Sequence, residues 1–141
     1  MVFTSRRRIR GNAVIEASFL IPWLVFMFVG VLDIGFYCQA AIATQNAARA
    51  GAAYTSLSST TAADATTACQ YAIQELQAMS NVRSLSSCNA TPLTVTAAKV
   101  TGVDGLWASS VSVTYVTNRM VPIPGLMSQF TIRRIVQMKL P

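Results

Sequence analysis

The residue most suggestive of chemistry is Glu16, a carboxylate just inside the start of the longest apolar stretch of the chain. Residues 17–32, which follow it, contain no charged side chain and one polar side chain, Ser18. A carboxylate costs about 2.5–3.5 kcal/mol to insert at a bilayer centre and less near its edge, so such a residue suggests a function. The alternative is that Glu16 reaches the membrane interface and is solvated there.

The rest of the chain offers little for catalysis. There is no histidine, which excludes histidine-based triads, histidine-ligated zinc and histidine acid–base chemistry. The chain contains no serine-nucleophile motif and no phosphate-binding loop. Its five carboxylates are too scattered to suggest a metal cage or an acid–base pair: Glu16, Asp33, Asp64, Glu75 and Asp104. We therefore expect no enzyme, no cofactor and no metal.

The positive charge is concentrated at the N-terminus. The 141 residues carry a formal charge of +6, and Arg6, Arg7, Arg8 and Arg10 lie within the first ten positions. A nucleic-acid-binding domain needs its charge spread over a folded face, so no nucleic acid partner is expected. Charged residues make up only 11% of the chain, against roughly 25% in an average soluble domain, which argues against a purely soluble or disordered chain.

Residues 13–43 are apolar or small except for a few polar side chains and two charges, Glu16 and Asp33. As a helix, residues 13–33 span roughly 30 Å, about one hydrocarbon core. Because the arginines precede this segment, the positive-inside rule places the N-terminus in the cytoplasm and the rest outside. Two alternatives stay open: a secretory signal peptide cleaved after Ala43, and a plain signal anchor.

Gly11 precedes Glu16 by five positions, so cleavage after Gly11 would make Asn12 the first and Glu16 the fifth residue. With the arginine-rich leader, this arrangement resembles the prepilin-peptidase site of type IV pilins. Residues 11–54 also resemble the opening of TadE-like proteins, the minor pseudopilins of the tight-adherence (Tad or Flp) pilus system. The positions that carry this resemblance are Gly11, Glu16, Pro22, Gly30, Asp33, Gly35, Phe36, Asn46, Ala47, Ala48, Arg49, Gly51 and Ala52.

The resemblance implies cleavage between Gly11 and Asn12 by a prepilin peptidase, and pairing of Glu16 with the N-terminal amine of a neighbouring subunit. The implied partners are a TadF-like companion pseudopilin, the major Flp pilin, the inner-membrane assembly platform and membrane lipid. Pro22 predicts a bend or melted turn, where Ser18 helps to satisfy the freed backbone. Asp33 is either solvated at the outer interface or pairs with a partner pseudopilin.

Beyond the span, the sequence predicts a loop over 56–67, with Asp64 as the N-cap of a helix over 65–79. Period-two patterns predict strands over 93–100, 107–116 and 130–140, and residues 121–125 must be irregular. The expected fold class is α+β: a long N-terminal transmembrane helix, a second shorter helix and a small antiparallel sheet of about three strands. Small residues after the span form a face for neighbouring pilin helices or for the protein's own sheet: Ala40, Ala43, Ala47, Ala48, Gly51 and Ala52.

The three cysteines have separate roles. Cys69 and Cys88 lie on the oxidising side and are expected to form one disulfide, the alternative being two free thiols. Closing a loop of about 20 residues would stabilise the fold by roughly 3 kcal/mol. Cys38, at the outer end of the span, is expected to pack as a small apolar residue.

We therefore expect three parts: a basic leader over 1–11, a transmembrane assembly helix over 12–55 and a periplasmic head over 56–141. The expected function is that of a minor pseudopilin in a Tad pilus used for adhesion, located in the bacterial inner membrane and optionally built into the pilus. Glu16, Pro22 and Asp33 are its expected assembly residues. The alternative is a single-pass, membrane-anchored periplasmic binding domain whose sheet and loop 122–124 form the binding surface.

Overall fold

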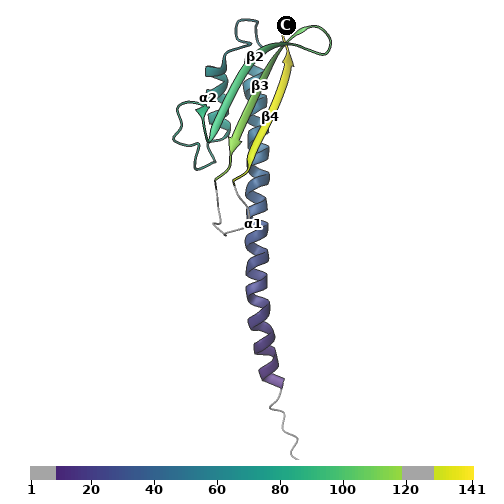
Figure 1. Cartoon of the computed structure of the whole chain (residues 1–141), viewed down its shortest axis with the longest axis vertical. Coiled ribbons are helices and arrows are strands. Elements are labelled where there is room, and N and C mark those ends of the chain that lie inside the picture. The colour runs from purple at the N-terminus through teal and green to yellow at the C-terminus, as the bar shows by residue number, and fades with distance from the viewer. Residues whose placement is uncertain (1–8, 119–128) are drawn as a thin grey trace, which may run out of the picture. The chain divides into compact units, whose positions relative to one another are not determined.

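The computed structural model describes residues 9–118 and 129–141, with side chains from residue 13 onward, and confirms the α+β class. The predicted irregular segment 121–125, with the loop 122–124, lies outside the described residues. Between Phe36 and Tyr37 the chain divides into two compact units. The elements in chain order are α1 (Ile9–Thr55), α2 (Ala65–Glu75), β1 (Asn89–Ala90), β2 (Leu93–Thr101), β3 (Trp107–Val116) and β4 (Thr131–Lys139) (Figure 1).

The sheet of the second unit is antiparallel throughout, in the order β1-β2-β3-β4. The sequence predicts the three long strands closely because each alternates apolar and polar residues. The fourth strand, β1, has only two residues, and no period can be read from so short a segment. β1 pairs with the start of β2 just after the peptide bond between Thr91 and Pro92, which is cis.

One face of the sheet forms the core of the second unit. β3 contributes Val111, Val113 and Tyr115, which are at most 2% exposed and alternate with half-buried serine and threonine residues. The part of α1 that belongs to this unit and α2 cover this face (Figure 1). They do so with small residues, which let the helix backbones approach the sheet closely: Ala40, Ala47, Ala48, Gly51, Ala52, Ala68 and Ala72.

A buried group of hydroxyls fixes where α1 ends against the sheet. The hydroxyl of Ser109 on β3 lies 2.6 Å from Thr55 Oγ1 and 3.1 Å from the carbonyl of Ala62. The Thr55 hydroxyl in turn lies 3.1 Å from the carbonyl of Gly51 within α1. Since all these polar groups are partnered, their burial does not carry the cost of unsatisfied groups.

α2 begins at the predicted cap and ends earlier than predicted. The Asp64 carboxylate accepts hydrogen bonds from the backbone N–H groups of Thr66 and Thr67, each 3.1 Å long. Hydrogen bonds from Thr67 above all lower the pKa of Asp64 below its ordinary value. The helix stops at Glu75 and not at residue 79, because tight turns follow it and continue the apolar stripe. In one of these turns the Met79 N–H donates to the Leu76 carbonyl over 2.9 Å.

We expect Gly51→Leu to destabilise the second unit by about 1–3 kcal/mol, the usual effect of overpacking a closely fitted core. A Cβ added at Gly51 would lie 3.3 Å from Val111 Cγ1 and 3.5 Å from the Ala68 Cβ, so a larger side chain must displace α2 or β3. Hydrogen exchange of the β3 amides measures the change. Gly30→Leu is the matched control, because nothing lies within 4 Å of a Cβ there; equal stability of the two variants would contradict this packing.

Candidate functional site: the exposed apolar helix

The part of α1 in the first unit is an apolar helix that its own unit leaves uncovered. From residue 13 onward nearly every side chain up to Phe36 is exposed, and Phe19 is 86% exposed. α1 is the one helix in the described ranges that is long and apolar enough to cross a membrane, over Ala13–Thr55, and none of its most apolar stretch is buried. A surface of this kind is suited to lipid or to other apolar helices.

Glu16 lies on this apolar surface and has no partner among the side chains that the structure describes. Its side chain is exposed, and no hydrogen bond or ion pair involves it among the described residues. The neighbouring apolar side chains Val14, Ile15 and Phe19 are all more than 65% exposed. A carboxylate in this setting is solvated only as long as water reaches it, so any partner that covers the helix must supply a cation or hydrogen-bond donors.

Asp33, the second carboxylate of the first unit, is not brought near Glu16. On a regular helix the two residues lie about 26 Å apart along the axis and about 100° apart around it. Asp33 is half-buried and has no hydrogen bond or ion pair among the described residues. The two acids therefore form two separate positions on the helix, and they do not form a joint site.

α1 runs through Pro22 without interruption, so the melted turn is wrong, whereas the alternative of a bend at Pro22 stays a prediction. A proline removes only one backbone hydrogen bond, and the neighbouring turns of a 47-residue helix hold the geometry. Ser18 was expected to help satisfy the backbone freed by Pro22, but its hydroxyl donates to the Ile15 carbonyl over 2.8 Å. Gly11 and Asn12 lie in the first turn of α1, and their side chains are outside the described residues.

The segment Asn46-Ala47-Ala48-Arg49 of α1 has two different surroundings. Ala47 and Ala48 are fully buried in the core of the second unit, whereas Asn46 and Arg49 are exposed. The small residues after the span therefore pack on the protein's own sheet, as one of the two predictions had it. Packing of this segment on neighbouring helices stays a prediction.

The cysteines follow the expected pairing with one correction. Cys69 on α2 and Cys88 before β1 form a disulfide, and both are nearly buried. Cys38 is a free thiol with an exposed side chain, so within this chain it does not pack as the small apolar residue that we expected. The buried Ala40 lies two positions further along α1, about 200° around the helix, which turns Cys38 away from the core.

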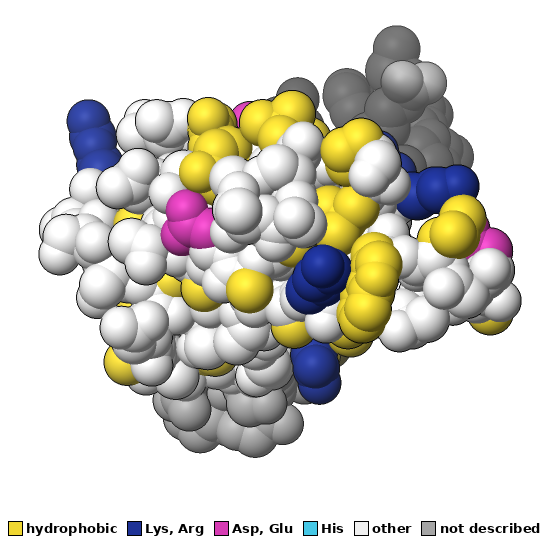
Figure 2. All heavy atoms as spheres, turned by 90° about the horizontal axis from the view of Figure 1, so that it is seen from above, with side chains coloured by type: hydrophobic (Ala, Val, Ile, Leu, Met, Phe, Trp, Pro, Cys, Tyr) yellow, Lys and Arg dark blue, Asp and Glu magenta, His cyan; other side chains and the backbone are white. Residues whose placement is uncertain are grey.

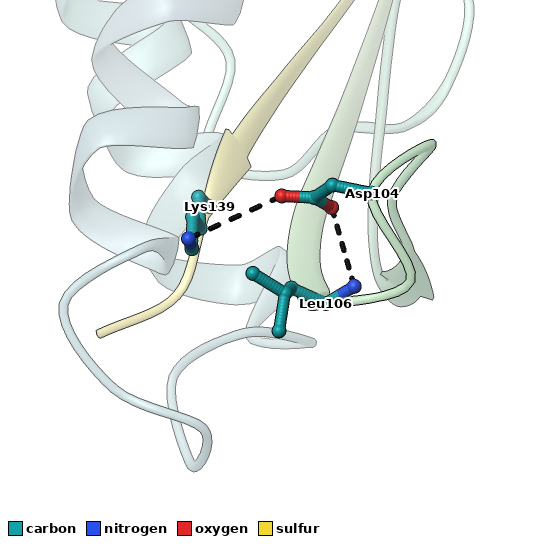
Figure 3. Close-up of polar contacts among 3 residues, drawn as sticks. All are labelled: Asp104, Leu106 and Lys139. Carbon is teal, nitrogen blue, oxygen red and sulfur yellow. Dashed lines mark hydrogen bonds and ion pairs between the residues drawn. The ribbon is translucent and has the colours of Figure 1, made fainter.

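The hairpin between β2 and β3 exposes residues that the sequence did not single out. Trp107 is 57% exposed, and the Lys99 ammonium lies 4.5 Å from the centre of its ring. Asp104 accepts a hydrogen bond from the Leu106 N–H over 3.2 Å and lies 4.0 Å from Lys139 Nζ (Figure 3). The signal in the sequence is Asp104 before Gly105, whose φ of 76° suits a glycine in a tight turn.

In the comparisons with known proteins, a protein family matches part of the chain, and the match lies within α1. Residues 11–53 match the family of TadE-like proteins. No curated protein and no solved structure matches the chain. The match begins at Gly11 and ends two residues before the end of α1. It includes Glu16, Pro22 and Asp33 as well as the buried small residues that hold α1 on the sheet. Residues 11–53 of this chain are therefore similar to the TadE-like proteins.

Proposed function

We propose that this chain is a minor pseudopilin of a Tad-type pilus, anchored in the bacterial inner membrane by α1 and assembled through that helix. The observation that supports this most directly is Glu16, a carboxylate on an exposed apolar helix that has no partner within the described part of the chain. The TadE-like match supports it independently, because it begins at Gly11, the residue before the proposed cleavage bond.

Cleavage after Gly11 would leave a positive amine on Asn12. In the proposed assembly, Glu16 of one subunit meets this amine on its neighbour while the apolar side chains around both exclude water. Two charges that pair in such a setting avoid the several kcal/mol that each would cost alone. Asp33, about 26 Å further along the helix, is a second position at which a partner subunit can supply a cation.

The proposed partners are those of such an assembly: a prepilin peptidase, a TadF-like companion pseudopilin, the major Flp pilin and the inner-membrane assembly platform. In this arrangement the N-terminus lies in the cytoplasm and the second unit in the periplasm. The excess of arginines before the span supports this orientation.

Sequencing the N-terminus of the protein isolated from membranes tests the proposal. We expect the mature chain to begin at Asn12. A chain that begins at Thr44 would instead identify a signal peptide, and one that begins at Met1 or Val2 would identify a plain anchor for a periplasmic binding domain. Either result would contradict the pseudopilin route.

Gly11→Leu is expected to leave the leader attached, because a bulky side chain next to the scissile bond prevents the backbone from entering the peptidase site. The fraction of cleaved chain, measured by mass spectrometry, should fall at least tenfold. Gly30→Leu is the matched control, since a side chain there meets open space and is remote from the bond. Equal cleavage of the two variants would contradict processing after Gly11.

A further inference from the structure

We propose that the outer edge of β4 binds an extended, acidic segment of a different protein as an added antiparallel strand. Among the strands that the structure describes, β4 is the last of the sheet; it has nine residues and pairs along one edge, with β3. The opposite edge of the sheet is partly covered, because β1 pairs with the first two residues of β2. β4 therefore presents the longer open edge of the sheet as the structure describes it.

Two hydrogen bonds at the ends of the β3–β4 ladder show which backbone groups are open. The Thr117 N–H donates to the Phe130 carbonyl over 2.9 Å, and the Leu140 N–H donates to the Trp107 carbonyl over 3.0 Å. In an antiparallel pair, residues bonded to the neighbour alternate with residues that point away from it. The even-numbered residues of β4 thus bond to β3, and the odd-numbered ones direct their backbone N–H and C=O groups to the open edge: Thr131, Arg133, Ile135, Gln137 and Lys139.

The side chains of β4 give this edge a positive charge. Arg133 Nε donates to the neutral Ser112 Oγ over 3.1 Å, and Arg134 is exposed without a hydrogen bond or ion pair among the described residues. Lys139 lies 4.0 Å from Asp104, but both side chains are more than half exposed, so this pair contributes little. Seen from above, the surface shows more Lys and Arg than acidic side chains, scattered among hydrophobic and neutral ones (Figure 2).

The charge decides which strand fits. A second copy of β4 would bring arginines close to arginines, which disfavours edge-to-edge pairing of this chain with itself. Nor can another segment of a second copy supply the acids, because no two of the five carboxylates of the chain lie within ten residues of each other. The occupant is therefore a segment of a different protein.

The register of β4 specifies the occupant further. Ile135 is 52% exposed on the open face of the sheet. Because an antiparallel partner strand runs in the opposite direction, its residue opposite Ile135 is followed by residues opposite Arg134 and then Arg133. A partner strand with an apolar residue followed by two acidic residues would place its carboxylates within about 4.5–5.5 Å (Cβ to Cβ) of both arginines, one on each face of the sheet.

Binding of a labelled nine-residue peptide to the full chain in phosphatidylcholine nanodiscs tests the proposal, with fluorescence anisotropy as the readout. The probe is Thr-Val-Thr-Val-Glu-Glu-Thr-Val-Thr, and its comparator carries two lysines in place of the glutamates. We expect the acidic peptide to bind about tenfold more tightly, since two charge pairs are exchanged for two repulsions. The double variant Arg133→Glu/Arg134→Glu should reverse the preference. Equal affinity of the two peptides for the unaltered protein would overturn the proposal.

Amide hydrogen exchange then locates the bound strand. The acidic peptide should slow exchange at least tenfold at Arg133, Ile135 and Gln137, whose N–H groups are open in the free protein. Gln137→Pro removes one open N–H without touching the β3 ladder, so it should weaken binding, whereas Thr101→Pro on the opposite edge should not. Continued protection at Val136 shows that β4 still folds in the variant. Binding without slowed exchange at the open amides would overturn the added-strand geometry.

Discussion

Replacing Glu16 with alanine is expected to remove pili from the cell surface while the protein remains inserted in the inner membrane. The reason is that the proposed pair between Glu16 and a neighbouring amine is buried once the apolar side chains of α1 are covered by other subunits. Breaking a buried ion pair by removing one partner costs about 3–5 kcal/mol, which corresponds to a loss of association of about a hundredfold or more. Electron microscopy counts the pili, and membrane fractionation with immunoblotting measures the inserted protein.

Two further variants separate the charge of Glu16 from its packing. Glu16→Gln keeps the shape and removes the charge, so it should fail almost as fully as alanine, whereas Glu16→Asp should retain part of the assembly. Val14→Ala is the control for lost apolar surface, because Val14 is 68% exposed on the same stretch of helix. Normal pili in the Glu16→Gln variant would show that Glu16 is merely solvated at the membrane interface, which is the alternative stated above.

The elements that could be predicted from the sequence are those with a sustained period. The alternation of Val111, Val113 and Tyr115 with serine and threonine gave strand bounds identical to those of β3, because one face of that strand is buried and the other is not. α1 was predictable for a different reason: its length and lack of charge leave few alternatives. The cap at Asp64 was predictable because an acidic side chain satisfies the first N–H groups of a helix.

The features that could not be predicted depend on contacts between segments far apart in the chain. β1 exists only because it meets the start of β2, and α2 ends at Glu75 because the following turns fold Leu76 and Val82 into the core. The contact of Ser109 with Thr55 joins residues 54 positions apart and leaves no local pattern. Likewise, Arg134 breaks the apolar alternation of β4 because it lies at the open edge of the sheet.

The candidate site is predictable in a more limited way. Sequence composition locates Glu16 and Asp33 within an apolar helix, and the structure adds that neither has a partner among the described residues. The partner of such a residue belongs to another molecule in the proposed assembly, so a single chain can display the carboxylates but not the group that pairs with them. Asn46 and Arg49 are exposed while the alanines between them are buried, so in the proposed assembly their partners would also belong to another molecule.

Removing the disulfide is expected to destabilise the second unit by about 3 kcal/mol, as the chain-entropy account predicts for a closed loop of this length. The bond joins residues 19 positions apart, and the loop between them contains Leu76 and Val82, both fully buried. Without the bond, the unfolded chain gains the freedom of that loop, while the folded chain keeps its contacts. The double variant Cys69→Ala/Cys88→Ala is used because serine at these positions would add the cost of burying a hydroxyl. Hydrogen exchange of the β3 amides in the full-length protein measures the free energy of unfolding.

The third cysteine provides the control for this experiment. Cys38→Ala also removes a sulfur atom, but from an exposed position of α1 outside the core, so the protection of the β3 amides should stay within about 0.5 kcal/mol of the unaltered protein. A difference between the two variants would assign the loss of stability to the closed loop and not to the chemistry of the thiol. Equal protection in both variants would contradict the predicted contribution of the disulfide, because the loop from Cys69 to Cys88 would then be held by its buried apolar residues alone.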